Sequence, residues 1–98
     1  MTEQEGAEEA AHAQSRAVLS GDMGAIVHGM TPEGFAKAME IGNTSWNSTG
    51  YEMVPLGRED DAYVFDITFQ TEAGPLTLRE RFRQIDGAWK MVDIERSS

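Results

Sequence analysis

Two carboxylates near the end of the chain, Glu80 and Asp93, are the residues best suited to chemistry. Glu80 stands in an alternating stretch whose one side also carries Leu78 and Phe82, so that a carboxylate interrupts an apolar row. Asp-Gly at positions 86–87 is a typical two-residue hairpin turn, because both turn residues need positive φ. Counting outward from this turn predicts that Glu80 and Asp93 lie directly opposite each other on one face of a sheet.

A pair of facing carboxylates has two interpretations. With Cβ atoms about 5 Å apart, two ionised acids repel, so that a compensating donor is needed or one acid keeps its proton at a raised pKa. Such coupled pairs serve as general acid–base catalysts. The alternative is a wet end of the sheet, where solvated acids are stable, and Glu95 on the same side as Asp93 favours it. The sequence leaves both interpretations open.

Four further residues are candidates for lining a ligand pocket: Tyr63, Trp89, His28 and Trp46. The tryptophans suit an aromatic wall, but they also serve as anchors in or beside a core. His28 suits a pocket, but also the boundary of a short helix. No metal site is expected, because His12 and His28 lie in different helices without a carboxylate or second histidine at ligand spacing. No cofactor is expected either.

The elements that must position these residues divide the chain into a helical half at 2–42, a polar linker at 43–50 and a sheet at 51–96. The first half is rich in helix formers and capping signals, and the second alternates with period two. The expected class is α+β, with three N-terminal helices packed on a curved four-stranded antiparallel meander in one domain, 1–98. Helices are expected at about 2–19, 23–28 and 32–41, and strands at about 51–58, 62–71, 75–85 and 88–96.

Three packing details follow from the same patterns. In the third helix, Phe35, Ala38 and Met39 are expected to face inward. A turn at 73–74 is expected to join the second and third strands. The first strand has two candidate inward sets, Tyr51 with Met53 or Val54 with Leu56.

The opposite face of the sheet carries Val64, Arg81, Val92 and Ile94 beside further arginines. A row of arginines is ordinary on a solvated antiparallel face. The aliphatic residues make the same face suitable for burial against a second copy of the chain. A solvated face and a homodimer interface therefore both remain open.

Composition limits the partners. The 98 residues carry a net charge of −9, which argues against nucleic-acid binding because that needs a basic surface. No apolar run is long enough for a membrane span, and the acidic N-terminus lacks the features of a secretory signal. The chain has no cysteine, so that a cytoplasmic location is the default expectation.

Three stretches resemble the nuclear transport factor 2-like superfamily, also called cystatin-like α+β: AVLSGD at 17–22, TPEGF at 31–35, and the final hairpins at 63–95 with their Asp-Gly turn followed by Ala-Trp-Lys. The resemblance implies a cone of helices and curved sheet that holds a ligand or active site, with Tyr63, Glu80, Trp89 and Asp93 on its wall. It also implies that dimerisation through the sheet is common.

Two departures from that group are visible. Met30 leads straight into Thr31-Pro32, which leaves no room for the additional strand pair of larger members. The chain therefore resembles the compact, lumazine-binding-like or ketosteroid isomerase/polyketide cyclase-like branch, with a smaller cavity. No counterpart of the isomerases' catalytic Asp or the dehydratases' His-Asp pair is present.

The expected function is a non-catalytic dimerising module that binds a small ligand in its cone. The alternative is a small isomerase, cyclase or hydratase that uses Glu80 or Asp93 as general acid–base, with Tyr63 or His28 as hydrogen-bond donor. A third hypothesis is a structural subunit whose sheet docks on a different protein.

Overall fold

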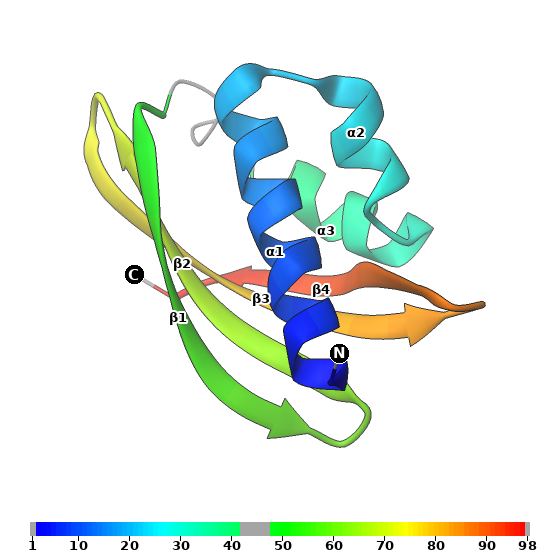
Figure 1. Ribbon diagram of the computed structural model, residues 1–98. Helices are drawn as coiled ribbons and strands as arrows, with labels where there is room; N and C mark the ends of the chain where they lie inside the picture. Colours follow the sequence, from blue (N-terminus) through cyan, green and yellow to red (C-terminus); the bar gives the residue numbers. More distant parts are fainter. Residues whose placement is uncertain (1, 42–47, 98) are drawn as a thin grey trace.

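The computed structural model describes residues 2–41 and 48–97. Within them, three helices precede four strands: α1 (Glu3–Ser20), α2 (Met23–His28), α3 (Pro32–Ile41), β1 (Gly50–Glu59), β2 (Ala62–Thr71), β3 (Gly74–Ile85) and β4 (Ala88–Arg96). The strands form one antiparallel sheet in the order β1-β2-β3-β4. The sheet is curved, and all three helices lie against one face of it (Figure 1). The expected α+β class is confirmed.

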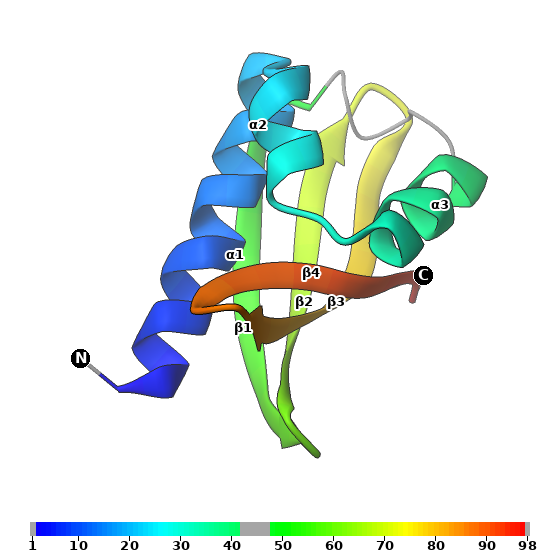
Figure 2. The ribbon, with the colours of Figure 1, turned by 90° about the vertical axis from the view of Figure 1, so that its right-hand side faces the viewer.

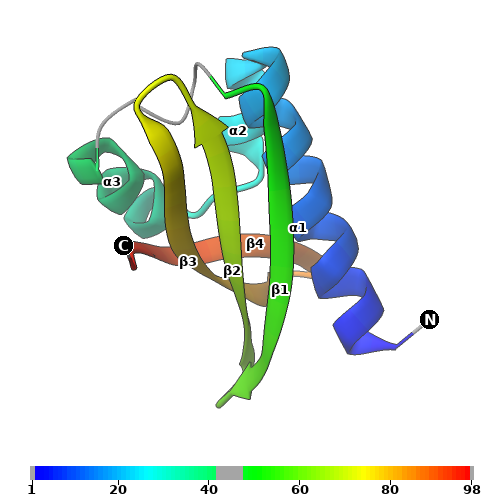
Figure 3. The same cartoon turned by 90° about the vertical axis from the view of Figure 1, so that its left-hand side faces the viewer.

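The element bounds agree closely with the sequence-based prediction. The polar linker is shorter than expected, because β1 already begins at Gly50. Part of it, including Trp46, lies outside the described residues, as does position 42. Figure 3 views the sheet from the side away from the helices, with β1, β2 and β3 side by side in front and β4 turned beneath the helices.

Local capping chemistry explains the three helix starts. Each helix is preceded by a capping residue whose side-chain oxygen accepts a hydrogen bond from the backbone N–H three residues later. These capping residues are Thr2, Asp22 and Thr31. Gly21 ends α1 with φ of 71°, a conformation that suits a residue without a Cβ. These signals are local, which is why the sequence predicted these helices.

Helix α3 packs on the edge strand β4 and not over the middle of the sheet (Figure 2). Gly34 lies so close to β4 that a Cβ there would stand 2.4 Å from the carbonyl oxygen of Met91. The chain just before α3 is bonded to the same strand, through Thr31 N–H to Met91 O (3.0 Å). As a result Met39 is 56% exposed, and the expectation that it faces inward is wrong.

The β2–β3 turn lies one residue earlier than predicted. Thr71 pairs with Gly74, so that the two turn residues are at 72–73 and not at 73–74. The Thr71 hydroxyl stabilises this turn by donating to Gly74 O (2.6 Å) and accepting from Ala73 N (3.2 Å). The pairing shifts by two residues, which leaves every side chain of β2 and β3 on its predicted face.

A β-bulge in β4 overturns the predicted pairing of the two carboxylates. The Asp-Gly turn at 86–87 is confirmed, with positive φ at both residues. Phe82 pairs with Met91 as expected, but the next pair along is Arg81 with Asp93. Val92 is the extra residue, and an extra residue turns the remainder of a strand over. Glu80 therefore lies opposite Ile94, whereas Asp93 points to the other face.

The core lies between the helices and the concave face of the sheet. Its largest fully buried side chains come from β2, β3 and β4: Phe65, Ile67, Phe69, Phe82 and Met91. Helix α1 contributes small residues, including Ala7 and Ala11, which allow it to approach the sheet closely. In β1, Tyr51 and Met53 pack against the core, while Val54 and Leu56 are exposed. This settles the two alternatives for the first strand.

Candidate functional site

Glu80 is a carboxyl group buried in the core. Its residue is 3% exposed, and its Oε1 atom has no hydrogen-bond partner among the described residues. Burial disfavours the charged form and raises the pKa of Glu80 to about 8. At neutral pH the group is therefore mainly a protonated acid, which is a hydrogen-bond donor as well as an acceptor.

Glu80 lies in the wall of an internal cavity of about 40 Å³. Apolar side chains from all three helices and three of the strands form most of that wall: Val18, Ile26, Met30, Phe35, Ala38, Met39, Ile41, Phe69, Leu78, Met91 and Ile94, with Gln14 as the other polar residue. A water molecule needs about 10–15 Å³ of such space. The cavity is therefore a small, mainly apolar space with one acid in it.

The position of α3 explains why a cavity exists here. Because Gly34 holds the helix against β4, its inner side chains reach only part of the concave face, and Phe35 and Ala38 stay half-buried. Met39 both lines the cavity and is largely exposed, so that the cavity approaches the surface on this side. The arrangement places a neutral acid in apolar surroundings close to solvent.

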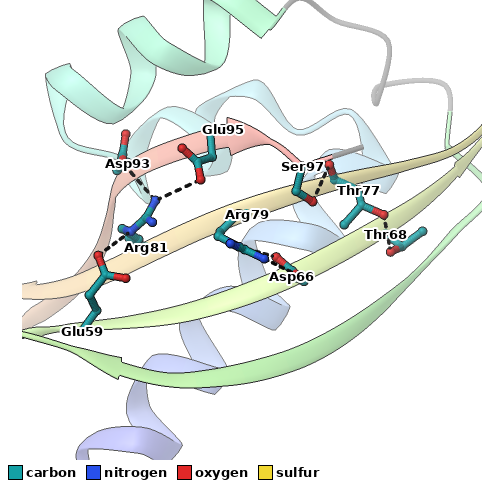
Figure 4. Close-up of polar contacts among 9 residues, drawn as sticks. All are labelled: Glu59, Asp66, Thr68, Thr77, Arg79, Arg81, Asp93, Glu95 and Ser97. Atoms are coloured by element: carbon teal, nitrogen blue, oxygen red, sulfur yellow. Dashed lines mark hydrogen bonds and ion pairs between the residues drawn. The ribbon is translucent and has the colours of Figure 1, made fainter.

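Asp93 belongs to a different environment. Its Oδ2 accepts a hydrogen bond from Arg81 Nη1 (3.1 Å) on the outer face of the sheet (Figure 4). Its Oδ1 forms an ion pair with Lys37 Nζ of α3 (3.0 Å). The prediction that Glu80 and Asp93 lie directly opposite each other is wrong, because the bulge at Val92 separates them onto opposite faces. They therefore form neither a coupled pair nor a pair of solvated acids at a wet end of the sheet, since Glu80 is buried.

The outer face is a network of paired charges. Arg79 binds Asp66 with two hydrogen bonds, Nε to Oδ1 (2.9 Å) and Nη2 to Oδ2 (3.1 Å), as Figure 4 shows. Arg81 Nε also reaches Glu59 Oε1 (3.3 Å). Of the four residues predicted for this face, three alternate onto it as expected: Val64, Arg81 and Val92. Ile94 does not, since the bulge turns it into the core, where it is 6% exposed.

Three of the predicted pocket residues gather beside α1, away from Glu80. Trp89 and His28 line a surface depression of about 240 Å³ with small residues of α1 and α2. Tyr63 packs edge-on against Trp89, with ring centroids 5.7 Å apart. The fourth predicted residue, Trp46, is among the residues that the structure leaves undescribed.

Gln14 is the site residue that sequence reasoning did not single out. It lines both the internal cavity and the depression that holds His28. Its Nε2 donates to the carbonyl oxygen of Ile26 (3.0 Å), which links α1 to α2. The signal was present, because Gln14 is a polar residue at a position of the apolar stripe of α1 and is 5% exposed.

The described residues contain no cluster of three or more histidines or carboxylates arranged to hold a metal ion. In the same part of the chain, none of the helices combines the length and apolar composition of a membrane span.

Comparison of the chain with protein-family models, curated proteins and solved structures found no significant match.

Proposed function

We propose that this domain binds a small, uncharged and mainly apolar molecule inside a cone of helices and sheet, where Glu80 forms a hydrogen bond with an acceptor atom of that molecule. The observation that carries this proposal is the Oε1 atom of Glu80, which is buried at the wall of an apolar cavity and has no hydrogen-bond partner in the part of the chain that the structure describes. An unsatisfied buried polar atom is unfavourable, and a ligand that supplies the missing hydrogen bond removes that penalty.

The charge state of Glu80 favours an uncharged ligand. Because its pKa is raised to about 8, the acid is mainly neutral at pH 7, and its O–H can donate a hydrogen bond to a carbonyl oxygen while keeping the proton. A cationic ligand would have to leave water for an apolar cavity and ionise Glu80 as well. A small ketone, ester or amide is therefore the best chemical match.

The geometry favours binding over catalysis. Proton-transfer reactions in such cavities need a second group to polarise or reprotonate the substrate. The expected second acid, Asp93, points away and is paired with Arg81 and Lys37. An isomerase, cyclase or hydratase that uses Glu80 alone remains the alternative, and the specific observation in its favour is a pKa near the pH at which a general acid–base works.

Dimerisation through the outer face is part of the same proposal. Exposed Val54 and Leu56 of β1 adjoin Val64, and the neighbouring arginines are already neutralised by carboxylates. Arginines that are already paired are buried with less desolvation penalty than free arginines. Sedimentation of the wild type and of Val54→Lys tests it, with a dimer expected for the first and a weakened dimer for the second. A wild-type monomer contradicts it and favours docking on a different protein.

Membership of the nuclear transport factor 2-like superfamily and a cytoplasmic location complete the proposal. The first is supported by the order of helices and strands and by the direct connection from Met30 to α3, and the second by the absence of cysteine.

Ligand binding is tested with three five-membered rings that differ only in their polar group: cyclopentanone, cyclopentane and cyclopentylammonium. Methyl NMR spectra of Met91 and Ile94 report binding in the cavity. We expect cyclopentanone to bind more tightly than the other two. Glu80→Gln keeps a donor and should keep this preference, whereas Glu80→Leu should remove it. Equal binding of all three rings by the wild type contradicts the proposal, as does a preference for the cation.

The catalytic alternative has its own readout in the same samples. Exchange of the α-protons of cyclopentanone for deuterium reports proton abstraction by an enzyme base. Exchange faster than in buffer, and lost in Glu80→Gln, supports the enzyme. Exchange at the buffer rate while cyclopentanone binds supports a binding module.

A further inference from the structure

The internal cavity is smaller than the pockets in which proteins usually bind ligands. Its volume is about 40 Å³, whereas typical ligand pockets measure about 300–1,000 Å³. The depression lined by His28 and Trp89 measures about 240 Å³ and approaches the cavity from the side of α1 and α2. Gln14 lies in the wall of both spaces.

The side chain of Gln14 is held between the two spaces by close contacts on both sides of its amide. Nε2 donates to Ile26 O (3.0 Å). Oε1 lies against Gly29, so closely that a Cβ on Gly29 would stand only 2.3 Å from it. The absence of a side chain at Gly29 therefore provides the room in which the amide of Gln14 lies.

We propose that Gln14 is a movable partition and the residue that determines ligand size, so that the cavity and the depression form one elongated binding site when its side chain turns aside. This inference rests on the proposed binding function. The joined site runs from the Glu80 carboxyl to the His28 and Trp89 rings. Its ligand has an acceptor atom at one end and a flat apolar ring at the other, because an indole binds flat rings by stacking.

Rotation of Gln14 is a smaller change than the alternative route, which is outward movement of α3. That helix is bound to β4 by the contact of Gly34 with Met91 O, by the Thr31 N–H bond to the same oxygen, and by the ion pair of Lys37 with Asp93. Gln14 is held by a single described hydrogen bond from a flexible side chain. Turning Gln14 aside therefore breaks one hydrogen bond between α1 and α2, whereas moving α3 outward breaks all three of these contacts with β4.

Three variants distinguish the partition from a purely structural role. Gln14→Ala removes it, and Gln14→Met keeps its length while removing the amide. Gly29→Ala displaces Oε1 while its backbone, with φ of −84°, accepts alanine without strain. The probe is 2-acetylnaphthalene, an uncharged ketone on a flat double ring, and cyclopentanone is the small reference ligand.

We expect Gln14→Ala to bind 2-acetylnaphthalene about tenfold more tightly than the wild type, and Gly29→Ala to change in the same direction. Gln14→Met should resemble the wild type, and in Gln14→Ala the gain in affinity should be smaller for cyclopentanone than for 2-acetylnaphthalene. In Gln14→Ala, one bound probe should give nuclear Overhauser contacts both to the Met91 methyl and to the His28 ring. If Gln14→Ala does not fold, Gly29→Ala decides the question by the same measurements.

Two results would contradict the proposal that Gln14 separates the two spaces. One is equal affinity of 2-acetylnaphthalene for Gln14→Ala and Gln14→Met, and the other is contact of the probe with one space alone. If cyclopentanone still contacts Met91 in those experiments, the proposed binding function stands and the partition alone fails. If cyclopentanone fails to contact Met91 in every protein, the proposed function fails together with the partition.

Discussion

The two faces of the sheet treat the same kind of side chain in opposite ways. On the outer face, Asp66 and Asp93 each lie within hydrogen-bond distance of an arginine and are partly exposed. On the inner face, Glu80 is buried beside apolar residues, and its Oε1 is unpaired among the described residues. All of these residues belong to β2, β3 and β4. The environment of each carboxyl group therefore depends on the face of the sheet to which its side chain points.

The comparison shows that a carboxylate's environment, and not its presence, decides whether it is a candidate for function. A paired acid on a surface keeps its charge at neutral pH and contributes little to stability. A buried acid without a partner loses its charge and lowers stability at high pH, and such a group persists most readily where it has a use.

The largest effect is expected from Ile94, whose inward position depends on the bulge. Ile94→Ala should lower the free energy of unfolding by about 2–5 kcal/mol, because it removes a buried side chain next to Glu80. Val92→Ala, on the outer side of the same strand and half-buried, is the matched control and should lower it by about 1 kcal/mol or less. Urea denaturation measures both. Equal losses for the two variants would mean that the bulge is absent.

Glu80 should give the protein an unusual dependence of stability on pH. Its folded pKa of about 8 lies above its unfolded value, so that between about pH 4.5 and 8 the unfolded chain releases this proton and the folded chain keeps it. The contribution of Glu80 is therefore most favourable below about pH 4.5 and is lost as pH rises toward 8, on the order of a few kcal/mol in total.

Glu80→Gln should lack this loss, because an amide does not titrate. Denaturation curves of both proteins between pH 5 and 8 measure the difference, which also cancels the contributions of other groups. Asp66→Asn, on the outer face, is the matched control and should not flatten the profile. Parallel profiles of wild type and Glu80→Gln would mean that Glu80 is exposed to solvent.

The smallest effect is expected from the outer network. A double-mutant cycle on Arg79 and Asp66 should give only a weak coupling despite the two hydrogen bonds, because solvent screens the pair. The coupling should fall when salt is raised to about 1 M, where the Debye length is only about 3 Å. A strong coupling that is insensitive to salt would mean that the outer face is buried, as in a stable dimer.

Sequence reasoning succeeded wherever the deciding interactions are local. The caps at Thr2, Asp22 and Thr31 lie next to the helices they start, and the Asp-Gly turn at 86–87 determines its own hairpin. The β2–β3 turn was misplaced by one residue, but the shift of two in pairing left Glu80 facing inward as predicted. The position of Glu80 in an apolar row on the inner face could thus be predicted from the sequence.

Sequence reasoning failed where a single residue changes the phase of a strand. Val92 is an ordinary strand former, and neither a glycine nor a proline marks the bulge that it makes. The partners that stabilise Asp93 outside, Arg81 and Lys37, come from another strand and from a helix far away in the sequence. The role of Gln14 likewise depends on Ile26 of α2 and on Gly29, the C-cap of that helix, which are brought to it by packing.

The sequence by itself determined the order of helices and strands, the turn at 86–87 and the inward position of Glu80, because caps, turns and period-two alternation act between near neighbours. Only the tertiary structure decided that Asp93 and Glu80 lie on opposite faces of the sheet. It also decided that α3 packs on β4 and leaves a cavity, and that Gln14 lies between two spaces. Those outcomes depend on which side chains can share one buried volume, and neighbours in the sequence do not determine that.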